Sequence, residues 1–190
     1  MRMFLRKSRV GRDPLVLAMS GVRLGERLLQ IGVDDPAVLG MLAAKTGISS
    51  HAAVVTLDDR GAERARAGIA GAGALADVAV TTDGTLPFED HSFDVVVVHG
   101  ASGLLPALAA DHRARLLEQV LRVTRSGGRV IVTEAGERSG VKAMLSPGPR
   151  RDERYEAAGG TAAAMQAAGF KPVRLLAERE GLRFTEGLRT

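Results

Sequence analysis

The sequence predicts an α/β fold: a seven-stranded sheet, mostly parallel with an antiparallel last strand, and helices on both faces. Short apolar segments largely alternate with helical ones along the 190 residues, which is typical of a parallel sheet covered on both sides. The run Phe93–Val98, which ends in four valines, indicates a strand buried within that sheet. The last two strands have too short a link for a crossover, so they must pair antiparallel. We expect a single domain spanning residues 1–190.

Capping signals define the predicted elements of the first half. Asp35 can cap a helix in which Pro36 takes the first position, and Gly47 can end that helix. Two acidic residues follow the second apolar strand directly. In chain order we expect a helix over 13–20, a strand over 28–33, the helix between Asp35 and Gly47, a strand over 51–57, a helix over 59–69 and a strand over 76–81.

The second half repeats this alternation up to the closing pair of strands. A long helix carries its leucines and valines on one side, and Ser126, Gly127 and Gly128 stop it. Gly169 ends the last helix. In chain order we expect the strand 93–98, a helix over 111–124, a strand over 129–133, a helix over 161–168, and strands over 172–177 and 182–186.

Two segments lie outside this alternation. Residues 136–160 are rich in Gly, Pro and charge, so we expect a long loop with at most one helical turn. This loop, which holds the only tyrosine, Tyr155, is either a lid over a substrate or a solvated charged loop. Residues 1–24 are expected to form a basic N-terminal helical extension.

Composition excludes several kinds of site. The chain has no Cys, so disulfides, thiolate metal sites and Cys nucleophiles are excluded. The four His are scattered, so we expect no metal site. With 3% aromatic residues and no Trp, a stacking platform for single-stranded nucleic acid is not expected. No apolar run could cross a bilayer, and the basic N-terminus lacks the core of a signal peptide, so the cytoplasm is the expected location. The net charge of +4 fits a solvated arginine-rich surface, with a basic face for an acidic ligand as the alternative.

The turn after the first strand has the layout of a nucleotide-binding loop in a Rossmann-like fold. An apolar strand runs into a helix start, as in folds that hold a cofactor at this point. A full fingerprint needs glycines because the backbone must approach the ligand closely. Only Gly32 is present here, and Asp34 and Pro36 stand where the next two glycines are expected.

With these elements in place, the chain from Arg23 to the C-terminus resembles class I S-adenosylmethionine-dependent methyltransferases of the small, single-domain, type 11 or UbiE-like kind. Residues 86–98, LPFEDHSFDVVVV, are similar to the family's LPF-D-SFD-VV segment, which enters the fourth strand. Residues 121–132, LRVTRSGGRVIV, are similar to the family's RVLKPGG turn into the fifth strand. Residues 168–184 resemble the closing antiparallel hairpin.

The resemblance implies that S-adenosylmethionine lies across the carboxyl ends of the first strands. It matches Gly32 to the first glycine of the cofactor loop and Asp58 to the acid that ends the second strand and binds the ribose hydroxyls. Asp83, followed by Gly84, lies near the acid that faces the adenine amino group, although Thr82 could take that place.

The same resemblance places residues 99 and 100 beyond the fourth strand, facing the methyl group and the acceptor. His99 is a candidate base and a candidate cofactor contact, with a simple lining role as the alternative. Asp58 is favoured as a cofactor ligand over a helix cap. Asp59, also a candidate cofactor residue, is favoured as the cap. Asp34 either repels the cofactor carboxylate or attracts its ammonium or sulfonium.

We therefore expect a methyltransferase acting on a small-molecule acceptor. The alternative is a non-catalytic binding or regulatory protein with the same fold and a degraded cofactor loop, in which cofactor binding is weakened or lost. A nicotinamide-dependent reductase ranks behind both, because the glycine pattern and a Tyr-Lys pair are lacking. A nucleic-acid methyltransferase ranks lower again, because no aromatic-flanked acceptor motif is present, and no membrane partner is expected.

Overall fold

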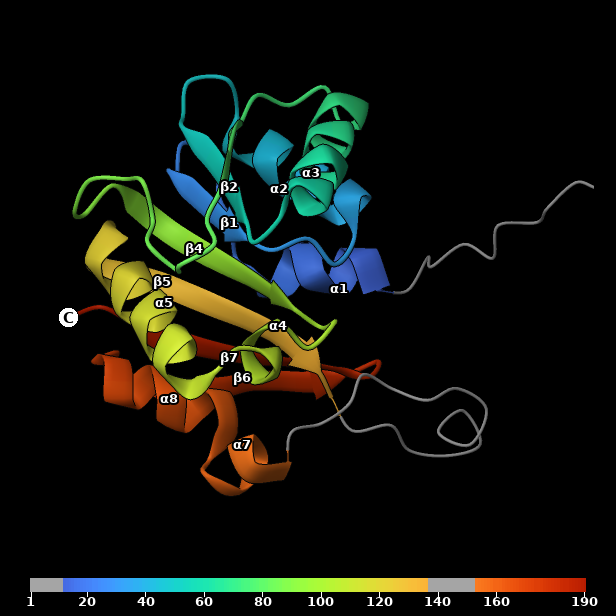
Figure 1. Ribbon diagram of the computed structural model, residues 1–190. Helices are drawn as coiled ribbons and strands as arrows, with labels where there is room; N and C mark the ends of the chain where they lie inside the picture. Colours follow the sequence, from blue (N-terminus) through green and yellow to red (C-terminus); the bar gives the residue numbers. More distant parts are fainter. Residues whose placement is uncertain (1–11, 137–152) are drawn as a thin grey trace, which may run out of the picture.

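The computed structural model describes residues 12–136 and 153–190, which form one seven-stranded sheet between two layers of helices (Figure 1). The strands are β1 (Leu28–Ile31), β2 (Ala52–Thr56), β3 (Asp77–Val80), β4 (Phe93–Gly100), β5 (Thr124–Ala135), β6 (Val173–Arg179) and β7 (Leu182–Leu188). The helices are α1 (Arg12–Met19), α2 (Pro36–Thr46), α3 (Asp59–Gly71), α4 (Leu104–Ala107), α5 (Ala110–Val123), α7 (Glu153–Ala157) and α8 (Gly160–Ala168).

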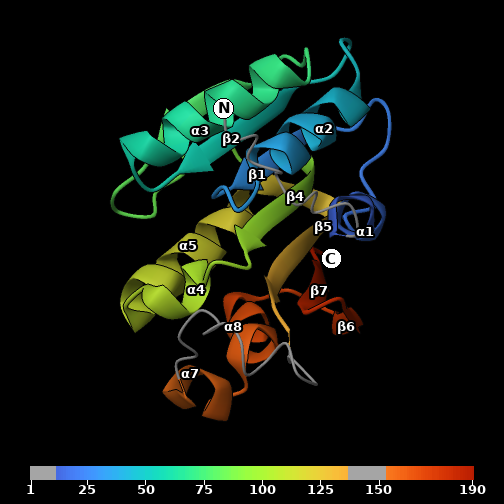
Figure 2. The same ribbon diagram turned by 90° about the vertical axis from the view of Figure 1, so that its right-hand side faces the viewer.

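The sheet order is β3-β2-β1-β4-β5-β7-β6, and β7 runs antiparallel to the other six strands. The predicted fold class is therefore confirmed, including the antiparallel last strand. Helices α1, α2 and α3 cover one face, and α4, α5, α7 and α8 cover the other (Figure 2). Because β1, β2 and β4 are parallel neighbours, their carboxyl ends meet at one edge of the sheet. We call this the carboxyl edge.

The first-half prediction is most accurate at α2. Asp35 is its N-cap and accepts a hydrogen bond from the Ala37 amide at 2.9 Å, Pro36 opens the helix, and Gly47 follows with φ of +80°. These signals are local in sequence, so they fix both ends of the helix. The predicted first helix also forms, as α1, while residues 1–11 of the predicted N-terminal extension lie outside the described residues.

The second half differs from the prediction in three places. Strand β5 begins at Thr124, which pairs with Phe93, and the register then shifts before residue 95 pairs with Arg129. The predicted stop at Ser126–Gly128 is thus an irregularity within a strand. The single-turn helix α4 was not predicted, because one turn shows no hydrophobic period. Of the predicted loop at 136–160, residues 137–152 lie outside the described part, while its end forms α7 and the start of α8.

Helices α2 and α3 cross in direct backbone contact. A Cβ atom added to Gly40 would lie 2.1 Å from the Gly68 carbonyl oxygen, and one added to Gly68 would lie 2.0 Å from the Pro36 carbonyl oxygen. Real Cβ atoms do not approach backbone this closely. The two glycines therefore fix the position of α2, and with it the loop that leads from β1 to Pro36. Among the described helices, none is long and apolar enough to cross a bilayer.

At the opposite end of the strands, Asp94 binds two arginines. Its carboxylate accepts hydrogen bonds from the Arg27 amide at 2.7 Å, the Arg27 side chain and the Arg125 side chain. Burial disfavours the ionised form, but the hydrogen bonds from Arg27 and Arg125 outweigh it and lower the Asp94 pKa to about 2. Asp94 thus has a structural role, because it ties Arg27 and Arg125 to the start of β4.

We predict that Asp94→Asn lowers the free energy of unfolding by about 2 kcal/mol at neutral pH. A carboxyl whose pKa is depressed on folding stabilises the protein above its unfolded pKa, and this stabilisation is lost as pH falls through the folded value. The difference between wild type and Asp94→Asn in urea unfolding should therefore shrink between about pH 4 and pH 2. A difference that is independent of pH would contradict this account.

Candidate functional site

Gly32 follows β1 at the carboxyl edge and is tightly packed by the chain itself. It has φ of +77°, and its amide donates to the Val55 carbonyl at 2.8 Å. An added Cβ would lie 3.0 Å from the His99 carbonyl oxygen and 3.3 Å from a methyl carbon of Leu104. A side chain here would be strained and crowded, so the described contacts alone explain the glycine.

Asp34 connects the two loops of the carboxyl edge. Its carboxylate accepts hydrogen bonds from the amides of Ala101, at 2.7 Å, and Ser102, at 2.9 Å. The Arg64 side chain fixes the backbone of the same loop by donating to the Val33 and Asp34 carbonyls, both at 2.9 Å. We call the contact of Asp34 with Ala101 and Ser102 the Asp34 clasp. It spans the β1–α2 and β4–α4 loops, between which the resemblance places the cofactor.

Asp58 is the N-cap of α3. It has φ of −153°, and its Oδ1 accepts a hydrogen bond from the Gly61 amide at 2.6 Å. Asp59 is the first helical residue, so the prediction that Asp59 is the cap is wrong by one position. Strand β2 ends at Thr56, which is buried and donates to the Asp58 carbonyl at 2.9 Å. The acid matched to the end of the second strand therefore lies two residues beyond it, exposed at the edge.

Asp83 lies in the turn after β3. Its carboxylate accepts hydrogen bonds from the Thr85 amide and hydroxyl at 2.9 and 3.0 Å, and from the Thr81 hydroxyl at 3.1 Å. The bonds from Thr85, followed by that from Thr81, lower the Asp83 pKa. Gly84 has φ of +81° and is buried, which suits its place in the turn. Thr82 and Asp83 are both exposed, so both alternatives for the adenine contact stay open.

His99 lies beneath the edge. The residue is 2% exposed, and its Nε2 is 3.0 Å from Oε1 of the fully buried Gln30. Gln30 Nε2 donates to the Leu39 carbonyl at 3.0 Å, so its Oε1 accepts from His99. Burial lowers the His99 pKa, against opposing effects of Asp34 and Asp35. His99 is therefore neutral, and its Nε2 donates to Gln30 inside the core, as expected of a packing group.

This pair explains why position 30 holds a glutamine. In the family that the chain resembles, an acidic residue is common at this position of the first strand. An ionised carboxylate could accept from His99 but could not donate to the Leu39 carbonyl. The amide satisfies both partners within the core.

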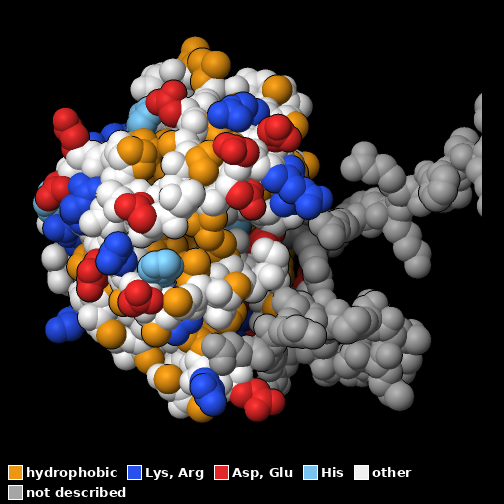
Figure 3. Space-filling view, in the orientation of Figure 1, with side chains coloured by type: hydrophobic (Ala, Val, Ile, Leu, Met, Phe, Trp, Pro, Cys, Tyr) orange, Lys and Arg blue, Asp and Glu red, His pale blue; other side chains and the backbone are white. Residues whose placement is uncertain are grey.

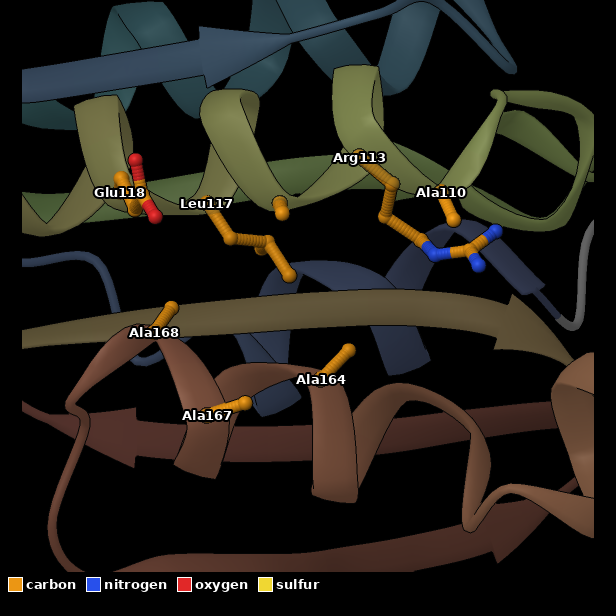
Figure 4. Close-up of a pocket in the computed structure, with 8 residues that line it drawn as sticks. Ala110, Arg113, Leu117, Glu118, Ala164, Ala167 and Ala168 are labelled. Atoms are coloured by element: carbon orange, nitrogen blue, oxygen red, sulfur yellow. The ribbon is translucent and has the colours of Figure 1, made fainter.

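A separate groove of about 330 Å³ lies between α5 and α8, on a helical face (Figure 4). Leu117 and three alanines of α8 line it, and Arg113 lies at one end. The Arg113 side chain donates to the Leu105 and Leu108 carbonyls, both at 3.1 Å. None of the predicted site residues lines this groove. Within residues 12–136 and 153–190, no cluster of three His, Asp or Glu side chains could hold a metal ion.

Comparisons with known proteins agree with this fold. The family model described as a methyltransferase domain matches residues 29–132. A methyltransferase structure from Aquifex aeolicus, described as S-adenosylmethionine-dependent, has a TM-score of 0.71 at 16% identity, over 92% of this chain and 88% of that one. A Pyrococcus horikoshii protein has a TM-score of 0.66 at 15% identity, over 97% and 93% of the two chains.

A third structure, PigF with S-adenosylhomocysteine (SAH), has a TM-score of 0.60 at 18% identity. The match covers 86% of this chain and 51% of PigF. No curated protein matches the sequence. At these identities the solved structures show the fold alone. The family model covers more than half of the chain, including β1 to most of β5, which build the carboxyl edge. The chain therefore belongs to the methyltransferase-domain family and has the fold of class I S-adenosylmethionine-dependent methyltransferases.

Proposed function

We propose that this chain is an S-adenosylmethionine-dependent methyltransferase acting on a small-molecule acceptor. The observation that carries the proposal is the family match over 29–132, which covers the strands and loops of the carboxyl edge. The presence of SAH in the PigF structure supports binding of the same class of ligand by this fold.

The residues at the adenosine end suit the cofactor. Ribose hydroxyls are donors, and Asp58 is exposed and caps α3 through Oδ1. Asp59 stands beside it with an exposed side chain. Asp83 remains ionised at neutral pH because its pKa is lowered, which suits a contact to the adenine amino group. When bound, the cofactor would supply an electrophilic methyl group carried on a sulfonium.

The residues that would hold the methionine end of the cofactor suit it less well. The Asp34 clasp occupies the amides of Ala101 and Ser102 with a negative side chain, whereas the cofactor carries a carboxylate of its own. This observation favours a second candidate function: a binding or regulatory protein that has lost the cofactor. Our proposal requires that Asp34 turns away or contacts the cofactor ammonium when the site is filled.

The charge pattern on one face of the molecule favours a small acceptor over a nucleic acid. On the face shown in Figure 3, Lys and Arg side chains alternate with Asp and Glu and do not form a continuous basic stripe. Nucleic-acid binding sites gather positive charge along one face. Methyl transfer needs mainly alignment of the acceptor with the methyl carbon and sulfur, so orientation of a small acceptor at the edge can supply most of the rate effect.

Replacing Asp58 tests the ribose contact. We predict that Asp58→Ala weakens SAH binding by about 1.5–3 kcal/mol, the usual value of hydrogen bonds to a charged group. It should also lower stability by about 1 kcal/mol, because the cap of α3 is removed. Asp58→Ser keeps a capping oxygen and is the matched control, so it should restore stability but not affinity. Unchanged SAH affinity in a folded Asp58→Ala protein would remove Asp58 from the site.

A further inference from the structure

Glu134 lies at the carboxyl edge, although nothing in its local sequence marks it. It is the second-last residue of β5 and pairs with Gly100, the last residue of β4. A Cβ atom on Gly100 would lie 3.9 Å from Glu134 Cγ, so the two positions are in contact. Ala101, which takes part in the Asp34 clasp, follows directly. Glu134 is thus adjacent to the loop that the resemblance assigns to the acceptor.

Glu134 is 8% exposed and ends a chain of buried hydroxyl groups. The Thr161 hydroxyl donates to Glu134 Oε1. The Tyr155 hydroxyl lies 2.7 Å from Thr161 Oγ1. Thr161 has one hydrogen and gives it to the ionised Glu134, so Tyr155 donates to Thr161. Both hydroxyl residues are 4% exposed. Within the described residues no donor contacts Oε2, so this oxygen can take up a proton.

No ion pair compensates the buried carboxyl among the described residues. The positive charge that acts on Glu134 is that of Arg183 in β7, and Arg183 pairs with Glu178 at 3.3 Å and Glu156 at 3.5 Å. Burial raises the Glu134 pKa, Glu156 adds to the effect, and Thr161 and Arg183 oppose it. A buried, unpaired carboxyl destabilises a fold, and such groups concentrate at functional sites.

Arg113, a second cation near the hydroxyl chain, is also engaged by other groups. The Arg113 guanidinium of α5 lies 4.3 Å from the centre of the Tyr155 ring and donates to two backbone carbonyls. Burial raises the Tyr155 pKa to about 12, so its hydroxyl stays protonated and remains a donor at neutral pH. The hydroxyl chain therefore orients Glu134 without neutralising it.

We propose that Glu134 is the catalytic base of the methyl transfer and takes the proton of an O–H or N–H acceptor on Oε2, with Thr161 and Tyr155 as positioning residues. This inference rests on the proposed function. The acceptor oxygen or nitrogen forms the bond to the methyl carbon, and the methyl–sulfur bond breaks with its electron pair left on sulfur. The acceptor proton passes to Glu134 and from there to water.

The titration of Glu134 in the folded chain gives a test that needs no turnover. Carbon-13 NMR of a glutamate-labelled sample should show one carboxyl with a raised pKa, and Glu134→Gln should remove that signal. Thr161→Val should raise this pKa further, since a hydrogen bond to the ionised form is lost, and Thr161→Ser should restore it. A Glu134 that never titrates in the folded protein cannot serve as a base, and this result would overturn the proposal.

The melting temperature provides a second test, in which Glu134→Gln and Asp94→Asn should change stability in opposite directions. A carboxyl whose pKa is raised on folding stabilises the fold below its unfolded pKa, and this contribution is lost as pH rises through the folded value. Glu134→Gln should therefore raise the melting temperature at neutral pH, whereas Asp94→Asn should lower it. A loss of stability in Glu134→Gln would indicate a purely structural carboxyl and contradict the base role.

Turnover separates this inference from the proposed function. Dopamine offers both a phenolic O–H and an amine N–H, and release of SAH can be followed with S-adenosylmethionine present. Glu134→Gln should slow the release by about 100-fold or more with SAH affinity unchanged. Equal rates would overturn the role of Glu134 and leave the proposed function intact. SAH binding without dopamine turnover in the wild type would remove this acceptor class, and a wild type that binds no SAH would overturn the proposed function itself.

Discussion

Replacing Gly68 by alanine is expected to leave little folded protein. The added Cβ would lie 2.0 Å from the oxygen and 2.6 Å from the carbon of the Pro36 carbonyl, and neither atom can move without displacing α2. We expect a loss of about 3–5 kcal/mol, a large share of the stability of a typical domain. Because Pro36 begins α2, any folded remainder should also have a displaced cofactor loop.

Gly71 in the same helix is the matched control. It also lies in α3, and a Cβ added there meets nothing within 4 Å. Gly71→Ala should therefore be neutral or stabilise by up to about 1 kcal/mol, because alanine loses less backbone entropy than glycine. Urea unfolding of both variants measures the contrast. Similar unfolding midpoints for Gly68→Ala and wild type would show that α2 and α3 do not cross as closely as described.

Replacing Asp34 by glycine is expected to tighten the binding of S-adenosylmethionine by about tenfold or more, which corresponds to about 1.4 kcal/mol. The change releases the amides of Ala101 and Ser102 and removes a negative charge from the methionine end of the site. It also restores a glycine where the resemblance expects one. Calorimetric titration of both proteins measures the difference.

Two controls accompany this variant. Asp34→Asn removes the charge and keeps one acceptor oxygen, so an intermediate affinity would separate repulsion from occupation of the amides. Unfolding must be measured alongside, because glycine adds unfolded-state entropy of roughly 0.5–1 kcal/mol and the clasp is lost. If Asp34→Gly instead weakens binding, Asp34 contacts the cofactor. The loop is then a rebuilt cofactor site and not a degraded one.

The features predicted well from the sequence depend on neighbours in the chain. The cap at Asp35 and the end of α2 at Gly47 use groups within three residues of each other. The mostly parallel sheet with its antiparallel last strand follows from alternating elements and a short final link. Asp58 and Asp59 can both cap a helix, so their order in the sequence does not identify the cap. The extended backbone at Asp58 identifies it.

The site itself depends on contacts that sequence spacing does not reveal. Asp34 meets Ala101 across 67 positions, and Gln30 meets His99 across 69. No local sequence pattern pairs these residues. From the sequence, Asp34 could therefore either repel or attract the cofactor, and His99 could be taken for an exposed base. Glu134 was missed for the same reason, since Thr161 reaches it from 27 residues away.

Calorimetric titration of the wild-type chain with SAH tests most directly whether the carboxyl edge is a cofactor site restrained by Asp34. The expected result is saturable binding that weakens in Asp58→Ala and tightens in Asp34→Gly. Folded wild-type and Asp34→Gly proteins that both show no binding heat would contradict it, and the chain would then be a binding or regulatory protein that keeps only the fold.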